Sequence, residues 1–189
     1  TSPHLETMQQ WAGSGALGSI LIAGTAGDGK TYHCRSLWMS LGGVAKAWAA
    51  PDLVKTLDLA DGRSAVFVKD LSELNDEQSD AVLDLLERSI LGEENAKFAV
   101  IATNHGQILE RLRDLGIRQG RVHPLRKPIQ EAFLLSGGLP ERLALYDLSR
   151  TAHRQSLVEV ISAVAGHPEW ENCKRCALQA EGRVCPIFE

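Results

Sequence analysis

A glycine-rich segment follows directly on a short apolar run near the N-terminus of the chain. The run Ser19–Ala23 is apolar and bounded by glycine, as expected of a buried strand. From Thr31 onward, apolar side chains at positions i, i+3, i+4 and i+7 predict a helix that ends at Gly42–Gly43. Between strand and helix the sequence fits the pattern G-x-x-x-x-G-K-[ST], with the residues Gly24, Thr25, Ala26, Gly27, Asp28, Gly29, Lys30 and Thr31.

The residue types of the segment Gly24–Thr31 suit an anionic ligand. Small residues let successive backbone N–H groups turn inward, and the helix that follows presents its positive end. Lys30 would reach the β- and γ-phosphates of a nucleotide, and the Thr31 hydroxyl would coordinate Mg²⁺. We therefore expect ATP and Mg²⁺ to bind this loop. A glycine turn without function is the alternative, and the flanking strand and helix disfavour it.

A magnesium site of this kind needs an acidic residue at the end of another strand, to hold the water shell of the ion. Asp70 follows the apolar strand predicted at Ala65–Val68 and is the candidate; an ordinary polar residue at a strand exit is the alternative. Many ATPases with such a loop carry a glutamate directly after this aspartate, which polarises the attacking water. Here Leu71 stands in that place, so Glu73 is the nearest candidate base.

Asn104 is the third polar residue predicted to face the ligand. It follows the continuous apolar strand Phe98–Ala102 and Thr103. An amide at a strand end beside the Asp70 strand could hydrogen-bond the γ-phosphate or the attacking water. The alternative is that Asn104 caps the helix that begins near His105, a position that asparagine favours.

Strands alternate with helices over the first two thirds of the chain. Because each strand is apolar throughout, we predict an α/β fold in which a parallel sheet is sandwiched between helices. Asn75 and Gln78 form a capping box at the start of one of these helices. Beyond those already given, the candidate strands are Leu53–Leu57 and Val122–Leu125, and the candidate helices end at Gly92, Gly116 and Gly166.

The alternation weakens after about residue 121, and we place a domain boundary close to it. Residues 1–127 are predicted to form the nucleotide-binding domain, and residues 128–189 a helical extension with a cysteine-rich tail. The chain begins at Thr1 rather than Met and ends soon after Cys185, so we expect it to be a piece of a longer protein.

The overall composition excludes several classes of protein. Apolar residues make up 44% and charged residues 23%, which excludes disordered and collagen-like chains. The net charge of −4 argues against a protein whose whole surface tracks nucleic acid. No segment approaches the ~20 apolar residues of a membrane span, so we expect a soluble protein without a membrane partner. Four cysteines, three of them in the last seventeen residues, suit a reducing compartment such as the cytoplasm.

A basic segment runs from Arg111 to Lys127. Between Glu110 and Lys127 there are six basic residues and two acidic ones, in a chain that is acidic overall. Such a segment could contact DNA phosphates or supply an arginine to a neighbouring subunit. A solvated helix face followed by a loop is the equally weighted alternative.

The C-terminal tail contains the pair Cys173 and Cys176 and, after eight further residues, Cys185. A C-x-x-C pair places two thiolates on one turn, ready to share a tetrahedral Zn²⁺ with a third cysteine. The fourth ligand would be His167, Cys34 or a residue beyond Glu189. Free thiols and a redox pair are the alternatives.

Over roughly residues 17–127 the chain resembles the additional-strand class of P-loop NTPases, including AAA+ and STAND ATPases. The run Ala65–Leu74 is similar to the acidic motif of the STAND group, and Ala102–Asn104 is more similar to AAA+. In those families an arginine from a neighbouring subunit often completes the site. The resemblance therefore implies a homo-oligomer, and Arg118 and Arg121 lie where such an arginine finger would be sought.

A narrower resemblance is to the DptF-like ATPase of bacterial DNA phosphorothioation-dependent restriction systems. It is carried by Gly27–Thr31 with His33 close behind, and by Trp170 together with the three tail cysteines. It implies an ATPase that acts as a switch or motor in a DNA restriction or antiphage defence complex. The alternatives are a nucleotide-dependent assembly scaffold with little turnover, a STAND-type signalling NTPase and a small-molecule kinase.

Overall fold

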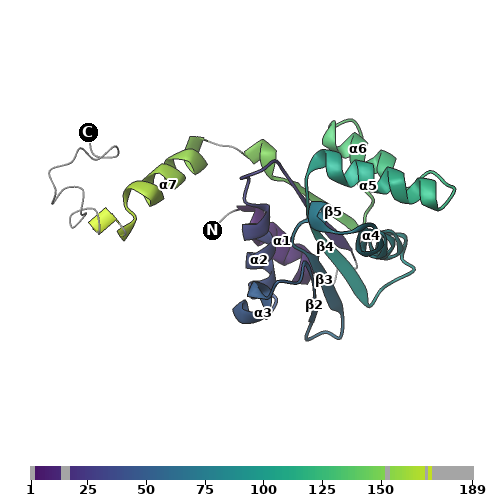
Figure 1. The fold of residues 1–189 in the computed structure, drawn as a ribbon, viewed down its shortest axis with the longest axis horizontal. Coiled ribbons are helices and arrows are strands. Elements are labelled where there is room, and N and C mark those ends of the chain that lie inside the picture. The colour runs from purple at the N-terminus through teal and green to yellow at the C-terminus, as the bar shows by residue number, and fades with distance from the viewer. Residues whose placement is uncertain (1–2, 14–17, 152–153, 169, 172–189) are drawn as a thin grey trace. The chain divides into compact units, whose positions relative to one another are not determined.

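The computed structural model describes residues 3–13, 18–151, 154–168 and 170–171 of the chain (Figure 1). The chain divides into two compact units, Thr1–Arg150 and Thr151–Glu189. The first unit holds all five strands that occur in the described residues. In the second, helix α7 spans Arg154–Ala165 and is followed by Gly166, as the apolar spacing predicts.

A single sheet organises the first unit. Its strand order is β2-β3-β4-β1-β5. β1 pairs in parallel with β4, and β4 with β3, which confirms the predicted parallel sheet for these three strands; β5, which was not predicted, also pairs in parallel with β1. The strands are β1 (Ser19–Ala23), β2 (Val54–Asp58), β3 (Ser64–Val68), β4 (Lys97–Thr103) and β5 (Leu143–Asp147).

The edge strand β2 departs from the parallel pattern, because it runs antiparallel to β3. Only residues 59–63 connect the two strands, and Leu59 N–H donates to the carbonyl of Arg63 across this turn. A parallel pair would need a crossover connection of a dozen or more residues. The candidate strand at Leu53–Leu57 therefore exists, but as one arm of a hairpin.

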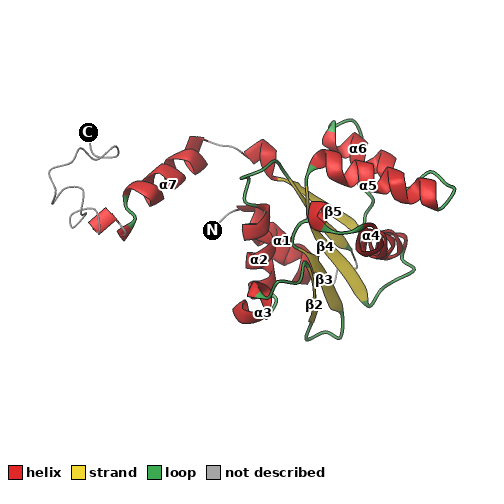
Figure 2. Ribbon diagram, in the orientation of Figure 1, coloured by secondary structure: helices red, strands yellow, loops and turns green. Residues whose placement is uncertain are grey.

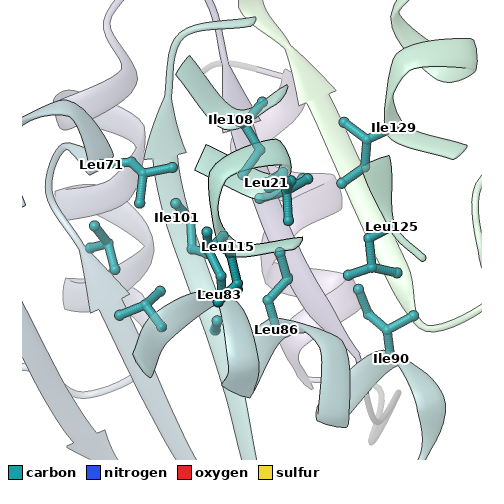
Figure 3. Close-up of a cluster of buried hydrophobic side chains, with 14 of the residues drawn as sticks. Leu21, Leu71, Leu83, Leu86, Ile90, Ile101, Ile108, Leu115, Leu125 and Ile129 are labelled. Atoms are coloured by element: carbon teal, nitrogen blue, oxygen red, sulfur yellow. The ribbon is translucent and has the colours of Figure 1, made fainter. Parts of the chain in front are cut away.

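Helices cover both faces of the sheet (Figure 2), which confirms the predicted sandwich. Along β1, Ile20 and Ile22 belong to the apolar cluster on one face of the sheet. Leu21 belongs to the cluster on the other face, which Figure 3 shows. This alternation explains why β1 is apolar at every position. One face carries α1 (Pro3–Gly13), α2 (Lys30–Ser40) and α3 (Ala45–Ala49); the other carries α4 (Asp76–Leu91), α5 (His105–Arg118) and α6 (Arg126–Phe133).

The prediction of a strand at Val122–Leu125 is wrong, because this segment is a turn between α5 and α6. Leu125 N–H donates to Nδ1 of the buried His123, 3.3 Å away, so a side chain takes the place of a strand partner. Among the described residues the last strand is β5, which begins at Leu143 and pairs with β1. The sheet unit therefore extends to Arg150, past the predicted boundary at residue 127.

Helix α5 continues through Gly116, where the sequence predicts its end, to Arg118. A Cβ atom at position 116 would lie 2.6 Å from the carbonyl oxygen of Arg121. Gly116 therefore allows the chain after α5 to fold back tightly against the helix, and it does not act as a stop signal.

Candidate phosphate-binding site

The segment Gly24–Gly29 forms a loop between the end of β1 and the start of α2. Gly27 and Gly29 have φ angles of 87° and 84°, in the left-handed region that glycine adopts without strain. Gly29 stands at the N-cap of α2, and no side chain caps this helix. The N–H groups of its first turn are therefore available to an anion at the positive end of the helix. The predicted strand, loop and helix are confirmed.

Lys30 folds back over the loop that precedes it. Its Nζ atom donates to the carbonyl of Thr25 at 2.6 Å and to the carbonyl of Gly24 at 3.3 Å. The residue is 9% exposed, so little of the side chain is free to sample other positions. The ammonium group is thus held against the backbone of the loop, at the carbonyls of Gly24 and Thr25.

Asp28 braces the loop from within. Its Oδ2 accepts hydrogen bonds from the Thr25 backbone N–H at 2.5 Å and from the Thr25 hydroxyl at 2.9 Å. A Cβ atom on Gly24 would come within 2.8 Å of the same carboxylate oxygen. The absence of a side chain at Gly24 therefore makes room for the brace.

Asp70 lies two residues after the end of β3 and caps the short helical turn Leu71–Glu73. Its Oδ1 accepts from the Ser72 backbone N–H at 2.9 Å and from the Ser72 hydroxyl at 2.7 Å. These bonds fix the carboxyl group through Oδ1, and Oδ2 has no hydrogen-bond partner among the residues that the structure describes. Glu73 ends the same turn and is exposed.

Asn104 occupies the N-cap position of α5, but its side chain does not cap the helix. Its Oδ1 atom is buried and makes no hydrogen bond within the described part of the chain. The capping alternative is therefore wrong with respect to the side chain. An orphaned amide oxygen at a strand end is the arrangement that a polar ligand would satisfy.

The sheet brings these residues to one edge. The strands β3, β4, β1 and β5 are parallel, so Asp70, Asn104 and the loop that begins at Gly24 all lie at their carboxyl ends (Figure 1). β4 lies between β1 and β3. With strands spaced about 4.8 Å apart, β1 and β3 are ~10 Å apart, a span that a hydrated cation and two side chains can cover.

The structure adds an ion-paired group that the sequence analysis missed. Asp147, at the end of β5, stands in register with Ala23, the last residue before the loop. His105 Nε2 lies 2.9 Å from Asp147 Oδ1, and Arg150 Nε lies 2.8 Å from Asp147 Oδ2. Since β1 lies between β4 and β5, the His105–Asp147 pair spans the end of the strand that leads into the loop.

The carboxyl group of Asp147 is held ionised. Burial opposes its ionisation, but hydrogen bonds from Ser149 and His105 outweigh burial and lower its pKa below the usual range. An acidic residue at the end of an apolar run is the signal that identified Asp70. The same signal in Leu143–Asp147 was missed because the strand itself was not predicted.

The basic segment Arg111–Lys127 is largely paired within the chain. Acidic residues of α4 provide most of the partners: Arg111 contacts Asp76, Arg118 contacts Asp80 and Arg121 contacts Glu87. These bonds occupy both of the guanidinium groups considered as arginine fingers and reduce the charge available to DNA. The structure therefore favours the interpretation of this segment as a helix face and loop.

Glu87 is the most enclosed acid of this network. It accepts from both terminal nitrogens of Arg121 at 2.6 Å, and the buried His123 Nε2 lies 3.2 Å away. The Arg121 hydrogen bonds lower the pKa of the Glu87 carboxyl, and burial lowers the pKa of His123. Both groups then bind fewer protons in the folded than in the unfolded chain. Stability should fall as the pH drops, first through His123 below its ordinary pKa of 6.5 and then through Glu87 below its ordinary pKa of 4.5.

We expect Glu87→Gln to lower the free energy of unfolding by about 1 kcal/mol near neutral pH, because the neutral amide loses charge-assisted bonds to Arg121. The deficit should shrink toward zero as the pH falls through the lowered pKa of Glu87, since the protonated acid resembles the amide. Urea denaturation at several pH values measures both quantities. A deficit of constant size across this range would contradict the role given to the carboxylate charge.

The predicted zinc ligands Cys173, Cys176 and Cys185 lie outside the described residues. His167 is described and is exposed. Cys34 is fully buried on α2, and burial raises the pKa of its thiol to about 12. Zinc binds the thiolate, so the structure argues against Cys34 as the fourth ligand. Across residues 3–13, 18–151, 154–168 and 170–171, no group of three or more His, Cys, Asp or Glu side chains is placed to hold a metal ion.

Comparison with known proteins adds no assignment: the chain matches no family model and no curated protein sequence. In the described ranges, every helix is too short or too polar to cross a membrane.

Proposed function

We propose that this chain binds Mg²⁺-ATP at Gly24–Thr31 and hydrolyses it. The observation that carries the proposal is the open N-terminus of α2, where two left-handed glycines and the folded-back Lys30 surround uncapped N–H groups. An anion bound there would accept from these N–H groups and from the Lys30 ammonium. The order of the phosphate loop, the acid and the amide along one sheet edge supports the same conclusion.

The residues present fit a triphosphate with its magnesium ion. The uncapped N–H groups and the Lys30 ammonium are donors that suit phosphate oxygens. The exposed Thr31 hydroxyl and the free Oδ2 of Asp70 are oxygen ligands of the kind that Mg²⁺ selects. When bound, Mg²⁺ neutralises charge on the β- and γ-phosphates. Asp70 would hold its water shell, and Thr31 would bind it directly.

Hydrolysis needs a group that orients the attacking water. Leu71, where a glutamate is common, is fully buried in the apolar core and leaves no room for one. Glu73 is the candidate base, and the Asn104 amide is the candidate contact for the γ-phosphate or the water. Turnover by this arrangement is expected to be slow. The buried Leu71 also favours the second candidate, a scaffold that assembles when ATP binds and turns it over little.

The biological setting is proposed from the resemblance alone. As a relative of AAA+ and STAND ATPases, and of the DptF-like group, the chain would form a homo-oligomer or bind other defence proteins. It would then act as a switch or motor in DNA restriction. The three tail cysteines, with His167, would hold a structural Zn²⁺. DNA contact through Arg111–Lys127 is the least supported part, because the arginines there have acidic partners.

The direct test is titration of the purified chain with a fluorescent ATP analogue, with and without Mg²⁺, followed by measurement of phosphate release. We expect binding in both conditions, strengthened by Mg²⁺, and a small turnover. Asp70→Asn should remove most of the strengthening by Mg²⁺ and leave the metal-free affinity unchanged. Absence of binding would refute the proposal, and binding without any phosphate release would favour the scaffold.

Two substitutions at Asp28 separate the effect of its hydrogen bonds to Thr25 from the effect of its negative charge. Asp28→Ala removes the acceptor for Thr25 and should weaken ATP binding by about tenfold. Asp28→Asn keeps an oxygen acceptor but removes a negative charge beside the triphosphate, so we expect affinity equal to or above that of the original chain. Equilibrium titration measures the ATP affinity of both variants. Equal losses of affinity would contradict the role given to the hydrogen bonds between Asp28 and Thr25.

A further inference from the structure

Four aromatic side chains that have no role in the proposed phosphate site gather beside the start of α2. His4 of α1, Tyr32 and His33 of α2, and Tyr146 of β5 come from elements that are far apart in the sequence. The His4 ring lies 6.4 Å from the His33 ring and 6.0 Å from the Tyr146 ring, in edge-to-face arrangements. The Tyr32 ring meets His33 at 5.4 Å and 89°.

This cluster is tied to the phosphate loop. Nδ1 of His33 lies 2.9 Å from the carbonyl oxygen of Gly29, the N-cap residue of α2. His33 is only 8% exposed, so its ring is fixed between the loop and His4. The Tyr32 ring meets this fixed ring nearly at a right angle.

Tyr32 itself is 60% exposed, although it follows directly on Thr31. A tyrosine with this exposure contributes little to the core, so packing does not account for an aromatic residue here. It is the next residue along α2 after Thr31, the predicted magnesium ligand. An exposed ring held from one side offers a surface on which a planar group can stack.

We infer that Tyr32 is the stacking platform for a purine base, and that His33, backed by His4 and Tyr146, holds the platform in place. The inference rests on the proposed function, because the triphosphate must be bound at Gly24–Thr31 for its base to lie at Tyr32. It extends that function by assigning the residue that recognises the base, so that the nucleotide is bound by its ring and not only by its phosphates. Stacking tolerates either purine, so ATP and GTP both satisfy it.

The test compares nucleotides with inorganic tripolyphosphate, which has the same charged groups and no base. Calorimetric titration of the original chain should give tighter binding for ATP and GTP than for CTP and tripolyphosphate. In Tyr32→Ala, ATP affinity should fall about tenfold, as expected when one stacked base loses its aromatic partner. Tripolyphosphate affinity should change less than twofold. Tyr32→Phe is the matched control and should retain the affinity for ATP.

The outcomes separate the two proposals. If neither ATP nor tripolyphosphate binds the original chain, the proposed function and this inference both fail. If tripolyphosphate binds as tightly as ATP, or if Tyr32→Ala leaves ATP affinity unchanged, the phosphate site stands and the inference fails. An equal loss of affinity for both ligands in Tyr32→Ala would also overturn the inference, because the substitution would then act on the loop. The exposure of Tyr32 predicts that both variants keep the melting temperature of the original chain.

Discussion

Replacing Lys30 with alanine is expected to lower the kcat/KM for ATP hydrolysis by about 10²–10³-fold, the range found when one preorganised donor to a transition state is removed. The Lys30 ammonium is held at the loop by the carbonyls of Gly24 and Thr25, so it is in position before the ligand arrives. Negative charge shifts among the phosphate oxygens in the transition state, and a fixed cation stabilises that shift. Alanine removes the cation and leaves the glycines of the loop unchanged.

The measurement is phosphate release under substrate-limiting conditions, with protein that melts at the temperature of the original chain. Lys46→Ala is the matched control, since Lys46 is exposed on α3, away from the loop, and should have no effect. Turnover in Lys30→Ala within a fewfold of the original chain would mean that the hydrolysis arises elsewhere, including from a contaminant.

The second large effect is on stability, at Phe67 on β3. We expect Phe67→Ala to lower the free energy of unfolding by about 3–5 kcal/mol, as large-to-small substitutions of buried aromatic residues do. The Phe67 ring is fully buried and meets the rings of Trp38 and Trp48 edge-on, at 5.3 Å and 6.1 Å. Alanine would leave a cavity between β3 and the helices α2 and α3, and edge-to-face contacts with both indoles would be lost.

Urea denaturation followed by tryptophan fluorescence measures this loss, because two of the indoles that report unfolding line the site. Phe67→Leu is the graded control and should cost about 1.5 kcal/mol, since it keeps an apolar side chain of nearly suitable volume. A loss below about 1 kcal/mol in Phe67→Ala would show that α2 and α3 collapse onto the strand freely. Because β3 leads to Asp70, we also expect the alanine variant to bind Mg²⁺-ATP less tightly than the leucine variant.

Elements defined by nearby residues could be predicted. The Asn75–Gln78 capping box forms as expected, with both reciprocal hydrogen bonds at the start of α4. The loop Gly24–Thr31 lies between the predicted strand and helix. Each of these signals is contained within a few consecutive residues. The contacts between their side chains and the nearby backbone do not depend on the rest of the chain.

Elements defined by distant partners could not be predicted. The acids of α4 lie 34 to 38 residues from the arginines that they pair with, in α5 and in the turn after it. The sequence alone does not reveal which acid each arginine contacts. The same holds for β5, a five-residue strand whose place depends on pairing with β1. Because β5 was not predicted, neither Asp147 at its end nor the contact between His105 and Asp147 could be placed.

Residue order along the chain was thus enough to predict a glycine-rich loop between a strand and a helix, and polar residues at positions 70 and 104 after two further strands. The tertiary structure decided which strands are neighbours and that the Asn104 side chain does not cap α5. It also decided that Tyr32 is exposed and contacts the ring of His33. These outcomes depend on packing between segments far apart in the sequence. The physical reason is that pairing and burial are collective, whereas turns, caps and apolar runs are formed by neighbours.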